Sequence, residues 1–195
     1  MKQLVIASSN PGKLREFQDM LAPLGIEVLT QAQLGIEEAD EPYGTFIENA
    51  LAKARHVSTA SGLPALADDS GICVEALGGA PGVLSARYAG IGPGSDQRNN
   101  EKLLHDMQGL ENRRAHYYCV LVLLHHADDP QPLMAEGEWH GEIAHAERGE
   151  GGFGYDPLFW LPELGRMSAE LTRDEKAQLS HRAQALRVLL EKLKR

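Results

Sequence analysis

The sequence has few cysteines and no long apolar run. Only two of its 195 residues are cysteines, Cys73 and Cys119, and they lie far apart without a CxxC pair. Such spacing argues against a secreted disulfide scaffold and against a zinc module, and it is typical of a reducing cytosol. The first ten residues hold an apolar run much shorter than a signal-peptide core, and no stretch of roughly 18 apolar residues occurs. We therefore expect a cytoplasmic protein with no membrane partner.

An excess of positive charge is also lacking. Lysine and arginine together number 19 against 28 aspartate and glutamate residues, which gives a formal net charge of −9. Nucleic acid polymers are bound largely through clustered cations that release counterions, so no polynucleotide is expected as a ligand. A small anionic molecule stays compatible with this composition if cations are gathered locally or supplied by a bound metal.

Repeats, low-complexity tracts and a linker are absent from the sequence, because its 20 glycines and 10 prolines are spread among the loops. Hydrophobic residues make up 43% and charged residues 24%, as in an ordinary globular protein. A chain of this length buries roughly 70% of its unfolded surface, which is enough for a stable core without disulfides. We predict a single domain over residues 1–195, with room for two lobes.

The N-terminal residues predict a strand, a turn and a helix. Residues 3–7 form a short apolar run typical of a buried strand, and the run ends in the turn SSNPGK at 8–13. Apolar residues then recur at helical spacing from Leu14 onward, with Asn10 as the N-cap. A second strand over 26–30 completes a βαβ unit of the kind that builds open α/β sheets.

Two capping boxes indicate further helices. Thr45 and Glu48 begin a helix that ends at Gly62, and Thr172 with Glu175 precedes a basic amphipathic helix at the C-terminus. The other predicted elements are strands over 65–67 and 72–75, a helix over 100–107, and strands over 116–124 and 133–143. The last two strands are expected to pair as a long hairpin with a polar turn of histidines and aspartates. The whole pattern indicates the α/β class.

The turn over residues 8–13 is the first candidate site. Small polar residues and a glycine at a helix N-terminus offer backbone N–H groups, and Lys13 adds an ammonium group, so the turn suits a phosphate. The turn lacks the first glycine and the Ser/Thr of a P-loop, and a plain capped turn is an equal alternative. The candidate residues are Ser8, Ser9, Asn10, Pro11, Gly12 and Lys13.

Two adjacent carboxylates, Asp68 and Asp69, form the second candidate. Next to Ser70 and Gly71 at the end of a predicted strand, they would repel each other unless separated, hydrogen-bonded or neutralised by a hard cation such as Mg²⁺. A solvated Asx-type turn is the alternative. Asp40 and Glu41 could complete a metal site, although their acidic run is by itself typical of a solvated loop.

The segment GEGGFGYDP at residues 149–157 is the third candidate. Its glycines allow the backbone to approach a ligand, and one ring of Phe153 or Tyr155 could lie against a flat base. Asp156 precedes a proline and is held extended, so its carboxylate can be aimed. A hairpin or Ω-loop with a packed aromatic residue is the alternative.

A basic stretch near the C-terminus is the fourth candidate. Lys176, His181 and Arg182 supply hydrogen-bond donors, which the O6 atom of an oxidised purine requires. Such donors would meet the amino group of adenine as donor against donor. Guanine would have to be excluded at position 2, and the sequence does not identify the residue responsible. The alternative is a solvated basic helix face.

Taken together, five ordered blocks resemble the inosine triphosphate pyrophosphatase (Ham1) family, most closely its bacterial members. The blocks are ASSNPGKLREF, TFIENALAKA, ALADDSGICVEALGGAPGVLSARYAG, GGFGYDPLFW and ELTRDEKAQLSHRAQAL, and they span nearly the whole chain. The resemblance implies an α/β fold with a long twisted mixed β-sheet flanked by helices, two lobes with a nucleotide cleft between them, and a homodimer. It further implies Mg²⁺-dependent hydrolysis of ITP, dITP and XTP to the monophosphate and pyrophosphate, which cleanses the nucleotide pool.

The resemblance also assigns roles by position. Residues 8–13 would line the triphosphate, Asp69 would be the catalytic carboxylate and a metal ligand, and Ser70 would touch the substrate. The second metal ligand would be Asp40 or Glu41, because an acidic pair precedes the TFIEN block, although the intervening PYG departs from the family's usual Thr-Gly. The base and its surroundings would be held by Phe153, Gly154, Tyr155, Asp156, Lys176, His181 and Arg182.

Three other functions stay open on the sequence. A nucleotide sensor would bind the same ligand without hydrolysing it, but it has little need of clustered carboxylates near phosphates. A phosphatase would release orthophosphate, and a related pyrophosphatase would act on modified pyrimidines. Product identity and a substrate panel distinguish these possibilities.

Overall fold

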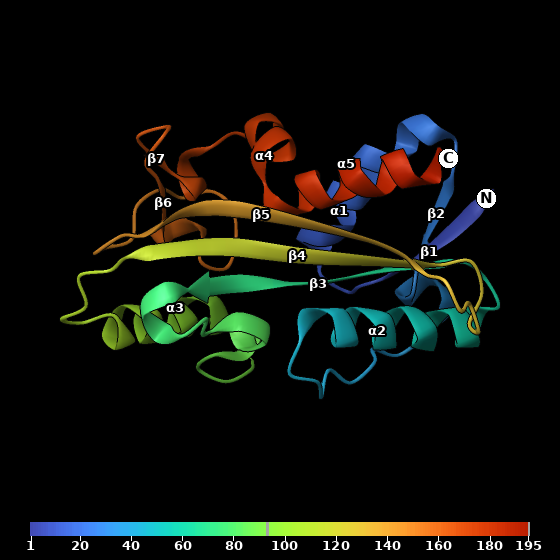
Figure 1. Ribbon diagram of the computed structural model, residues 1–195, viewed down its shortest axis with the longest axis horizontal. Coiled ribbons are helices and arrows are strands. Elements are labelled where there is room, and N and C mark those ends of the chain that lie inside the picture. The colour runs from blue at the N-terminus through green and yellow to red at the C-terminus, as the bar shows by residue number, and fades with distance from the viewer. Residues whose placement is uncertain (93, 195) are drawn as a thin grey trace. The chain divides into compact units, whose positions relative to one another are not determined.

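The chain forms a mixed sheet flanked by helices, as predicted. The structure is a computed structural model that describes residues 1–92 and 94–194, with only the backbone of Leu24. Within these residues one seven-stranded sheet has the order β2-β1-β3-β4-β5-β6-β7 (Figure 1). The strands are β1 (Gln3–Ala7), β2 (Glu27–Thr30), β3 (Ala65–Val74), β4 (Arg114–Leu124), β5 (Leu133–Ile143), β6 (Phe159–Leu161) and β7 (Arg166–Met167). The helices are α1 (Pro11–Leu21), α2 (Phe46–Ser61), α3 (Ser95–Asp106), α4 (Arg173–Leu179) and α5 (His181–Leu193).

The residues divide into two compact units, each with its own apolar core. Unit 1 comprises residues 1–69, 119–136 and 185–195, and unit 2 comprises residues 70–118 and 137–184. The core of unit 1 is built on Phe17, Leu66 and Leu121, and that of unit 2 on Ile72, Tyr117 and Phe159. The single two-lobed domain over 1–195 stays a prediction.

In unit 1 a βαβ unit begins the chain, as the apolar runs predicted. Strand β1 pairs in parallel with β2 and also in parallel with β3, where Ala7 lies opposite Ala67. Helices α1 and α5 cover one face of these strands and α2 covers the other (Figure 1). The turn after β1 and the residues that follow Ala67 in β3 therefore leave the same edge of the parallel strands.

Strand β3 corrects one prediction. The sequence predicted two short strands, over 65–67 and 72–75, on either side of residues 68–71, but the structure has one continuous strand over Ala65–Val74. Asp68 and Asp69 are 2% and 5% exposed, so a solvated Asx-type turn is wrong. Because successive side chains of a strand point to opposite faces, the two carboxylates are separated by the strand itself. Ion pairs described below stabilise the carboxylates of Asp68 and Asp69 within the strand.

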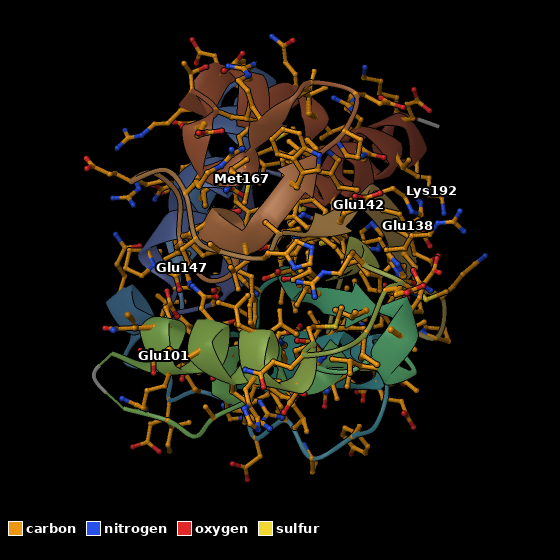
Figure 2. All side chains as sticks on the ribbon, turned by 90° about the vertical axis from the view of Figure 1, so that its left-hand side faces the viewer. Glu101, Glu138, Glu142, Glu147, Met167 and Lys192 are labelled. Atoms are coloured by element: carbon orange, nitrogen blue, oxygen red, sulfur yellow. The ribbon has the colours of Figure 1, made fainter. Side chains whose placement is uncertain are left out.

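In unit 2, α3 lies on one side of β3 and β4 and α4 lies on the other, while β6 and β7 continue the sheet beyond β5 (Figure 1). Along β5, exposed glutamates alternate with buried residues such as Trp139 and Ile143. Figure 2 shows two of these glutamates, Glu138 and Glu142. The alternation is what a strand with one buried face requires. Strands β6 and β7 were not predicted, because three-residue and two-residue strands carry no periodic signal.

The C-terminal helix also differs from the prediction. The capping box at Thr172 and Glu175 is present, but it begins a short helix, α4, that stops at Ser180. Ser180 has extended backbone angles (φ −62°, ψ 155°), and α5 begins directly after it. The break separates Lys176 from His181 and Arg182, which therefore lie on different helices. None of the helices in the described part of the chain is long and apolar enough to cross a membrane.

The turn between β4 and β5 supports a prediction about stability. The Asp129 carboxylate accepts the backbone N–H groups of His125 (3.0 Å) and Gln131 (2.9 Å), and also contacts Nδ1 of His125 at 3.0 Å. The backbone hydrogen bonds from His125 and Gln131 lower the pKa of Asp129 to about 2. We expect Asp129→Ala to lower the melting temperature by about 5 °C near neutral pH, measured by circular dichroism.

The pH dependence of that difference has a definite sign. Since the folded-state pKa is depressed, the carboxylate stabilises the fold fully above its unfolded pKa of about 3.9, and this contribution is lost as the pH falls toward 2. The gap between wild type and variant should be constant from pH 7 to about pH 5 and shrink below about 4. A gap that widens on acidification would contradict this assignment.

Candidate active site

The turn after β1 is a capped helix start. Oδ1 of Asn10 accepts the N–H groups of Gly12 (2.9 Å) and Lys13 (3.1 Å), which confirms Asn10 as the N-cap. The N–H of Asn10 in turn donates to Oγ of Ser8 at 3.2 Å. The prediction of free backbone N–H groups is therefore wrong for Asn10, Gly12 and Lys13, because the short polar side chains of the turn accept hydrogen bonds from these N–H groups. The turn presents hydroxyl groups and one ammonium group in their place.

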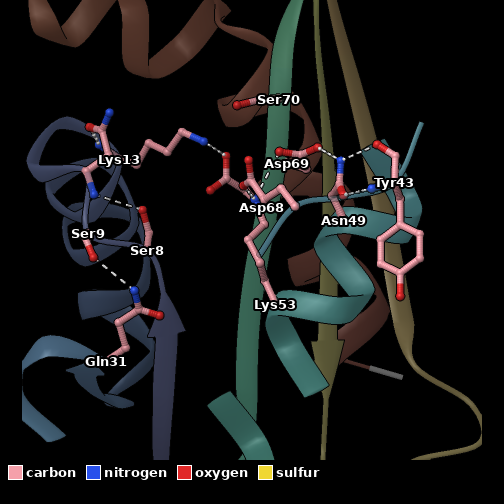
Figure 3. A network of polar contacts seen from close by, with 12 residues as sticks. Ser8, Ser9, Lys13, Gln31, Tyr43, Asn49, Lys53, Asp68, Asp69 and Ser70 are labelled. Atoms are coloured by element: carbon pink, nitrogen blue, oxygen red, sulfur yellow. Dashed lines mark hydrogen bonds and ion pairs between the residues drawn. The ribbon is translucent and has the colours of Figure 1, made fainter. Parts of the chain in front are cut away.

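Lys13 joins this turn to β3. Its Nζ lies 2.8 Å from Oδ2 of Asp68, and the Asp68 side chain is only 1% exposed (Figure 3). Lys13 itself keeps 18% of its side chain exposed. The predicted phosphate turn and the predicted carboxylate pair are thus brought together in unit 1, although the two segments are 55 residues apart (68 − 13).

Asp69 lies against α2. Its Oδ1 is 3.0 Å from Nζ of Lys53, and its Oδ2 accepts from Nδ2 of Asn49 at 3.3 Å (Figure 3). The same Lys53 ammonium group is 2.6 Å from Oε1 of Glu41. Asn49 also exchanges two hydrogen bonds with the backbone of Tyr43, at 3.1 and 3.2 Å, which fixes the loop that carries Glu41.

Burial and charge act against each other at Asp69. Burial raises the pKa of this carboxyl group, the Lys53 ammonium group lowers it in part, and the charge of Glu41 adds to the increase. At Lys53 burial lowers the pKa, but the carboxylates of Asp69, Asp68 and Glu41 outweigh burial and leave the pKa raised. Asp69 is thus a desolvated carboxylate whose charge is supported mainly by Lys53 and to a smaller extent by Lys13, an environment typical of catalytic groups.

The structure separates the two candidates for the second metal ligand. Glu41 shares Lys53 with Asp69, whereas Asp40 is exposed. Two carboxylates that converge on one cation offer the hard oxygen donors that Mg²⁺ prefers. Among the described residues no group of three or more His, Cys, Asp or Glu side chains could hold a metal ion by itself. One or two carboxylates are nevertheless enough for Mg²⁺ when substrate phosphates supply other ligands.

Asp156 organises the glycine-rich segment of unit 2. Its Oδ2 accepts the N–H of Phe153 at 2.8 Å and pairs with Nζ of Lys176, and its Oδ1 accepts from Oγ of Ser168 at 2.8 Å. Gly152 adopts φ +77°, and a Cβ there would lie 2.1 Å from Asp156 Oδ2, so this position requires glycine. Because Asp156 is 3% exposed and both oxygens are engaged, its clearest role is to hold the segment and Lys176. A direct contact with substrate stays a prediction.

An exposed ring and a cation lie together beside Asp156. Nζ of Lys176 is 5.2 Å from the ring centroid of Phe153, and Phe153 is 40% exposed. Tyr155, the other predicted aromatic residue, is 4% exposed, and its hydroxyl donates to the carbonyl of Ser85 at 2.8 Å. Of the two predicted rings, Phe153 is therefore the one available to a base, while Tyr155 packs in the core.

The two predicted donors at the start of α5 are buried. The His181 ring stacks on Tyr117 with centroids 4.9 Å apart and an interplanar angle of 10°. Arg182 is 2% exposed, and its Nη2 donates to Oγ of Ser70 at 3.0 Å. The alternative prediction, a solvated basic helix face, is therefore wrong for His181 and Arg182. The Arg182 contact brings two predicted substrate-binding residues, Arg182 and Ser70, side by side in unit 2.

A hollow of about 470 Å³ in unit 2 is a separate feature. Its lining includes Trp139, Gly141, Leu161 and Leu179, and none of its lining residues is a predicted site residue. It is mostly apolar and offers no phosphate-binding turn, so we do not identify it with the candidate site.

Sequence reasoning missed four residues that complete these clusters, Asn49, Lys53, Tyr117 and Ser168. Asn49 and Lys53 are one helical turn apart on α2, and Asn49 is fully buried beside Ala50. A polar residue on the buried stripe of an otherwise amphipathic helix is a signal that could have identified them. Tyr117 and Ser168 carry no such local signal.

Comparisons with known proteins find relatives over nearly the whole chain. A model described as the Ham1 family matches residues 4–192. The dITP/XTP pyrophosphatase of Ralstonia nicotianae is 62% identical over 196 residues, covering 100% of this chain and 98% of the relative. That of Nitrosomonas europaea is 62% identical over 193 residues, covering 99% and 95%. The solved structure of a HAM1 protein from Coxiella burnetii matches with a TM-score of 0.93 and 44% identity, covering 100% and 99%.

Proposed function

The chain belongs to the Ham1 family, and from this premise we propose that it hydrolyses non-canonical purine nucleoside triphosphates. It is a dITP/XTP pyrophosphatase, and we extend its substrates to ITP. Water attacks the α-phosphorus, the bond to the bridging oxygen of the α–β anhydride breaks, and the products are the nucleoside monophosphate and pyrophosphate. The observation that carries the proposal is the Lys13, Asp68, Asp69 and Lys53 cluster, which combines cations for a polyphosphate with a desolvated carboxylate.

Within this cluster, Asp69 and Lys13 have different chemical roles. Asp69, whose ionised form is supported by Lys53, orients the attacking water in line with the scissile anhydride. Lys13 offsets the charge that develops on the pyrophosphate leaving group. The hydroxyl groups of Ser8 and Ser9 add hydrogen bonds to phosphate oxygens, while Asn10, Pro11 and Gly12 set the shape of the turn. A bound polyphosphate would compete with Asp68 for the ammonium group of Lys13.

Magnesium fits the same cluster. Asp69 and Glu41 would hold the ion, since both already lie within 3.0 Å of one cation, Lys53. When bound, Mg²⁺ supplies positive charge that neutralises phosphate oxygens and makes water more acidic. Asp40, being exposed, is the weaker candidate.

The base is read by residues of unit 2. Phe153 offers its exposed ring to the flat face, and Lys176, His181 and Arg182 offer donors to a keto oxygen at position 6. Each buried donor left facing the amino group of adenine costs about 1–3 kcal/mol, which disfavours ATP. Ser70, which accepts from Arg182, holds that guanidinium group in place.

We also propose a cytoplasmic homodimer. The near absence of cysteine fits a reducing compartment, and the family resemblance supports the dimer. Light scattering coupled to size-exclusion chromatography should give twice the mass of one chain.

A substrate panel with varied metal tests the proposed activity. We expect pyrophosphate from ITP, dITP and XTP, at least about 100-fold slower release from ATP and GTP, and no turnover after chelation of Mg²⁺. Pyrophosphate and orthophosphate are assayed separately in each reaction. Orthophosphate as the first product would identify a phosphatase, and tight binding of ITP without turnover would identify a sensor.

A further inference from the structure

Helix α3 holds Gly154, which lies between the two aromatic residues of the glycine-rich segment. The N–H of Gly154 donates to Oδ2 of Asp96 at 2.9 Å, and its carbonyl accepts from Nδ2 of Asn100 at 3.2 Å. Asp96 and Asn100 are four residues apart on α3, so their side chains lie on one face of the helix. A single helix therefore binds both polar groups of one backbone residue.

These two bonds add to the turn that contains Gly154, in which the N–H of Asp156 donates to the carbonyl of Phe153 at 3.3 Å. Gly154 adopts φ +60°, and apart from its two chain neighbours no heavy atom lies within 4 Å of the position that a Cβ would take, so a side chain there would have no packing partner. Asn100 is 3% exposed, and its Oδ1 has no hydrogen-bond partner among the described residues. An unpaired buried carbonyl is unfavourable, so Asn100 stabilises Gly154 through its Nδ2 donor and not through Oδ1.

The backbone on either side of Gly154 is also held, while the ring of Phe153 is not buried. The N–H of Phe153 donates to Asp156, and the carbonyl of Tyr155 accepts from the N–H of Leu158 at 2.9 Å. Phe153 nevertheless keeps 40% of its surface exposed. An exposed ring on a backbone that is hydrogen-bonded at consecutive residues is a preorganised contact surface.

We propose that Asp96 and Asn100 are positioning residues that fix the Phe153 ring to receive the base of the substrate. The identity of that ligand rests on the proposed function. Asp96 and Asn100 act through Gly154, so their loss affects binding of the base and leaves the phosphate chemistry of unit 1 intact.

Kinetics of substituted proteins test this role. Asp96→Ala and Asn100→Ala should each raise the KM for ITP about ten-fold while kcat stays within about two-fold, because a hydrogen bond to a fixed backbone group is lost. Asp96→Asn keeps an acceptor oxygen and should restore most of the affinity. Asn100→Asp has nearly the same shape but no donor, so it should resemble Asn100→Ala. The inhibition constant of inorganic tripolyphosphate, which has no base, should not change in any of them.

Asp106→Ala is the matched control. Asp106 is an aspartate of the same helix that contacts Tyr88 and Lys102, away from Gly154. If α3 has only a structural role, Asp106→Ala and Asp96→Ala will change KM equally, which would overturn the proposal. Hydrogen exchange at residues 152–155 adds a measurement independent of substrate, and it should quicken in Asp96→Ala and not in Asp106→Ala.

The outcomes separate this inference from the proposed function. A wild-type protein without activity on ITP overturns the proposed function and the ligand named here. An active wild type with an unchanged KM in Asp96→Ala and Asn100→Ala, or with unchanged exchange at residues 152–155 in Asp96→Ala, overturns the positioning role alone.

Discussion

Asp69→Asn should reduce kcat for ITP by about 10³-fold at saturating Mg²⁺, because an amide can neither carry the charge that orients water nor bind a metal ion as a carboxylate does. The substituted side chain has nearly the same shape and can still contact Asn49 and Lys53, so the fold should be retained. Burial raises the pKa of Asp69, which means that its charge is unfavourable in the folded state. The melting temperature should accordingly stay the same or rise.

Asp68→Asn is the matched control for this prediction. Asp68 is the preceding residue of the same strand, is equally buried, and also pairs with a lysine. We expect a loss of about ten-fold, because Lys13 remains in place without its partner. Rates of pyrophosphate release and thermal unfolding curves give the comparison. Near-normal turnover in Asp69→Asn, or equal losses in the two variants, would show that Asp69 is not the catalytic carboxylate.

Arg182→Ala should reduce the preference for ITP over ATP by about 10- to 100-fold. The guanidinium group is 2% exposed and held by Ser70, so it is a fixed donor whose loss affects a keto oxygen more than an amino group. We expect kcat/KM for ITP to fall steeply while that for ATP changes little. The Mg²⁺ concentration for half-maximal activity should not change, because Asp69 and Glu41 remain.

Two further variants distinguish a loss of selectivity from a loss of stability. Removing a buried arginine destabilises the protein, so Arg182→Lys, which keeps a cation, and His181→Ala, which leaves Arg182 in place, are measured beside it. Both should lower the ratio of kcat/KM for ITP to that for ATP by smaller factors. The donor explanation of selectivity is wrong if all three variants keep the wild-type ratio.

Much of the fold could be predicted from local patterns, and the errors have physical causes. Asn10, Thr45 and Thr172 cap helices as their spacing predicted, since capping depends on a few neighbouring residues. Residues 68–71 were not predicted as part of a strand, because β3 accommodates the carboxylates of Asp68 and Asp69 only through Lys13 and Lys53, which are distant in sequence. The C-terminal helix is interrupted at Ser180, where no proline or glycine in the sequence indicates a helix end.

The candidate site was predictable in its residue types and less so in its connections. Asp69, Lys13 and Arg182 could be named from short motifs, whereas the partners Lys53 and Asn49 depend on how α2 packs against β3. The N–H groups of Gly12 and Lys13 were expected to be free, but the same Asn10 that marks the helix start occupies them. A capping signal and a phosphate-binding signal compete for the same donors, and sequence alone does not decide between them.

The alternation of Asp68 and Asp69 across β3 constrains how this strand can change. Each aspartate forms an ion pair with a different helix, Asp68 with Lys13 of α1 and Asp69 with Lys53 of α2. A one-residue insertion or deletion between Ala65 and Ala67 would turn both side chains to the opposite faces, so that neither aspartate would keep its lysine partner. Length changes are therefore tolerated in the surrounding loops and excluded from this strand, whichever residues fill it.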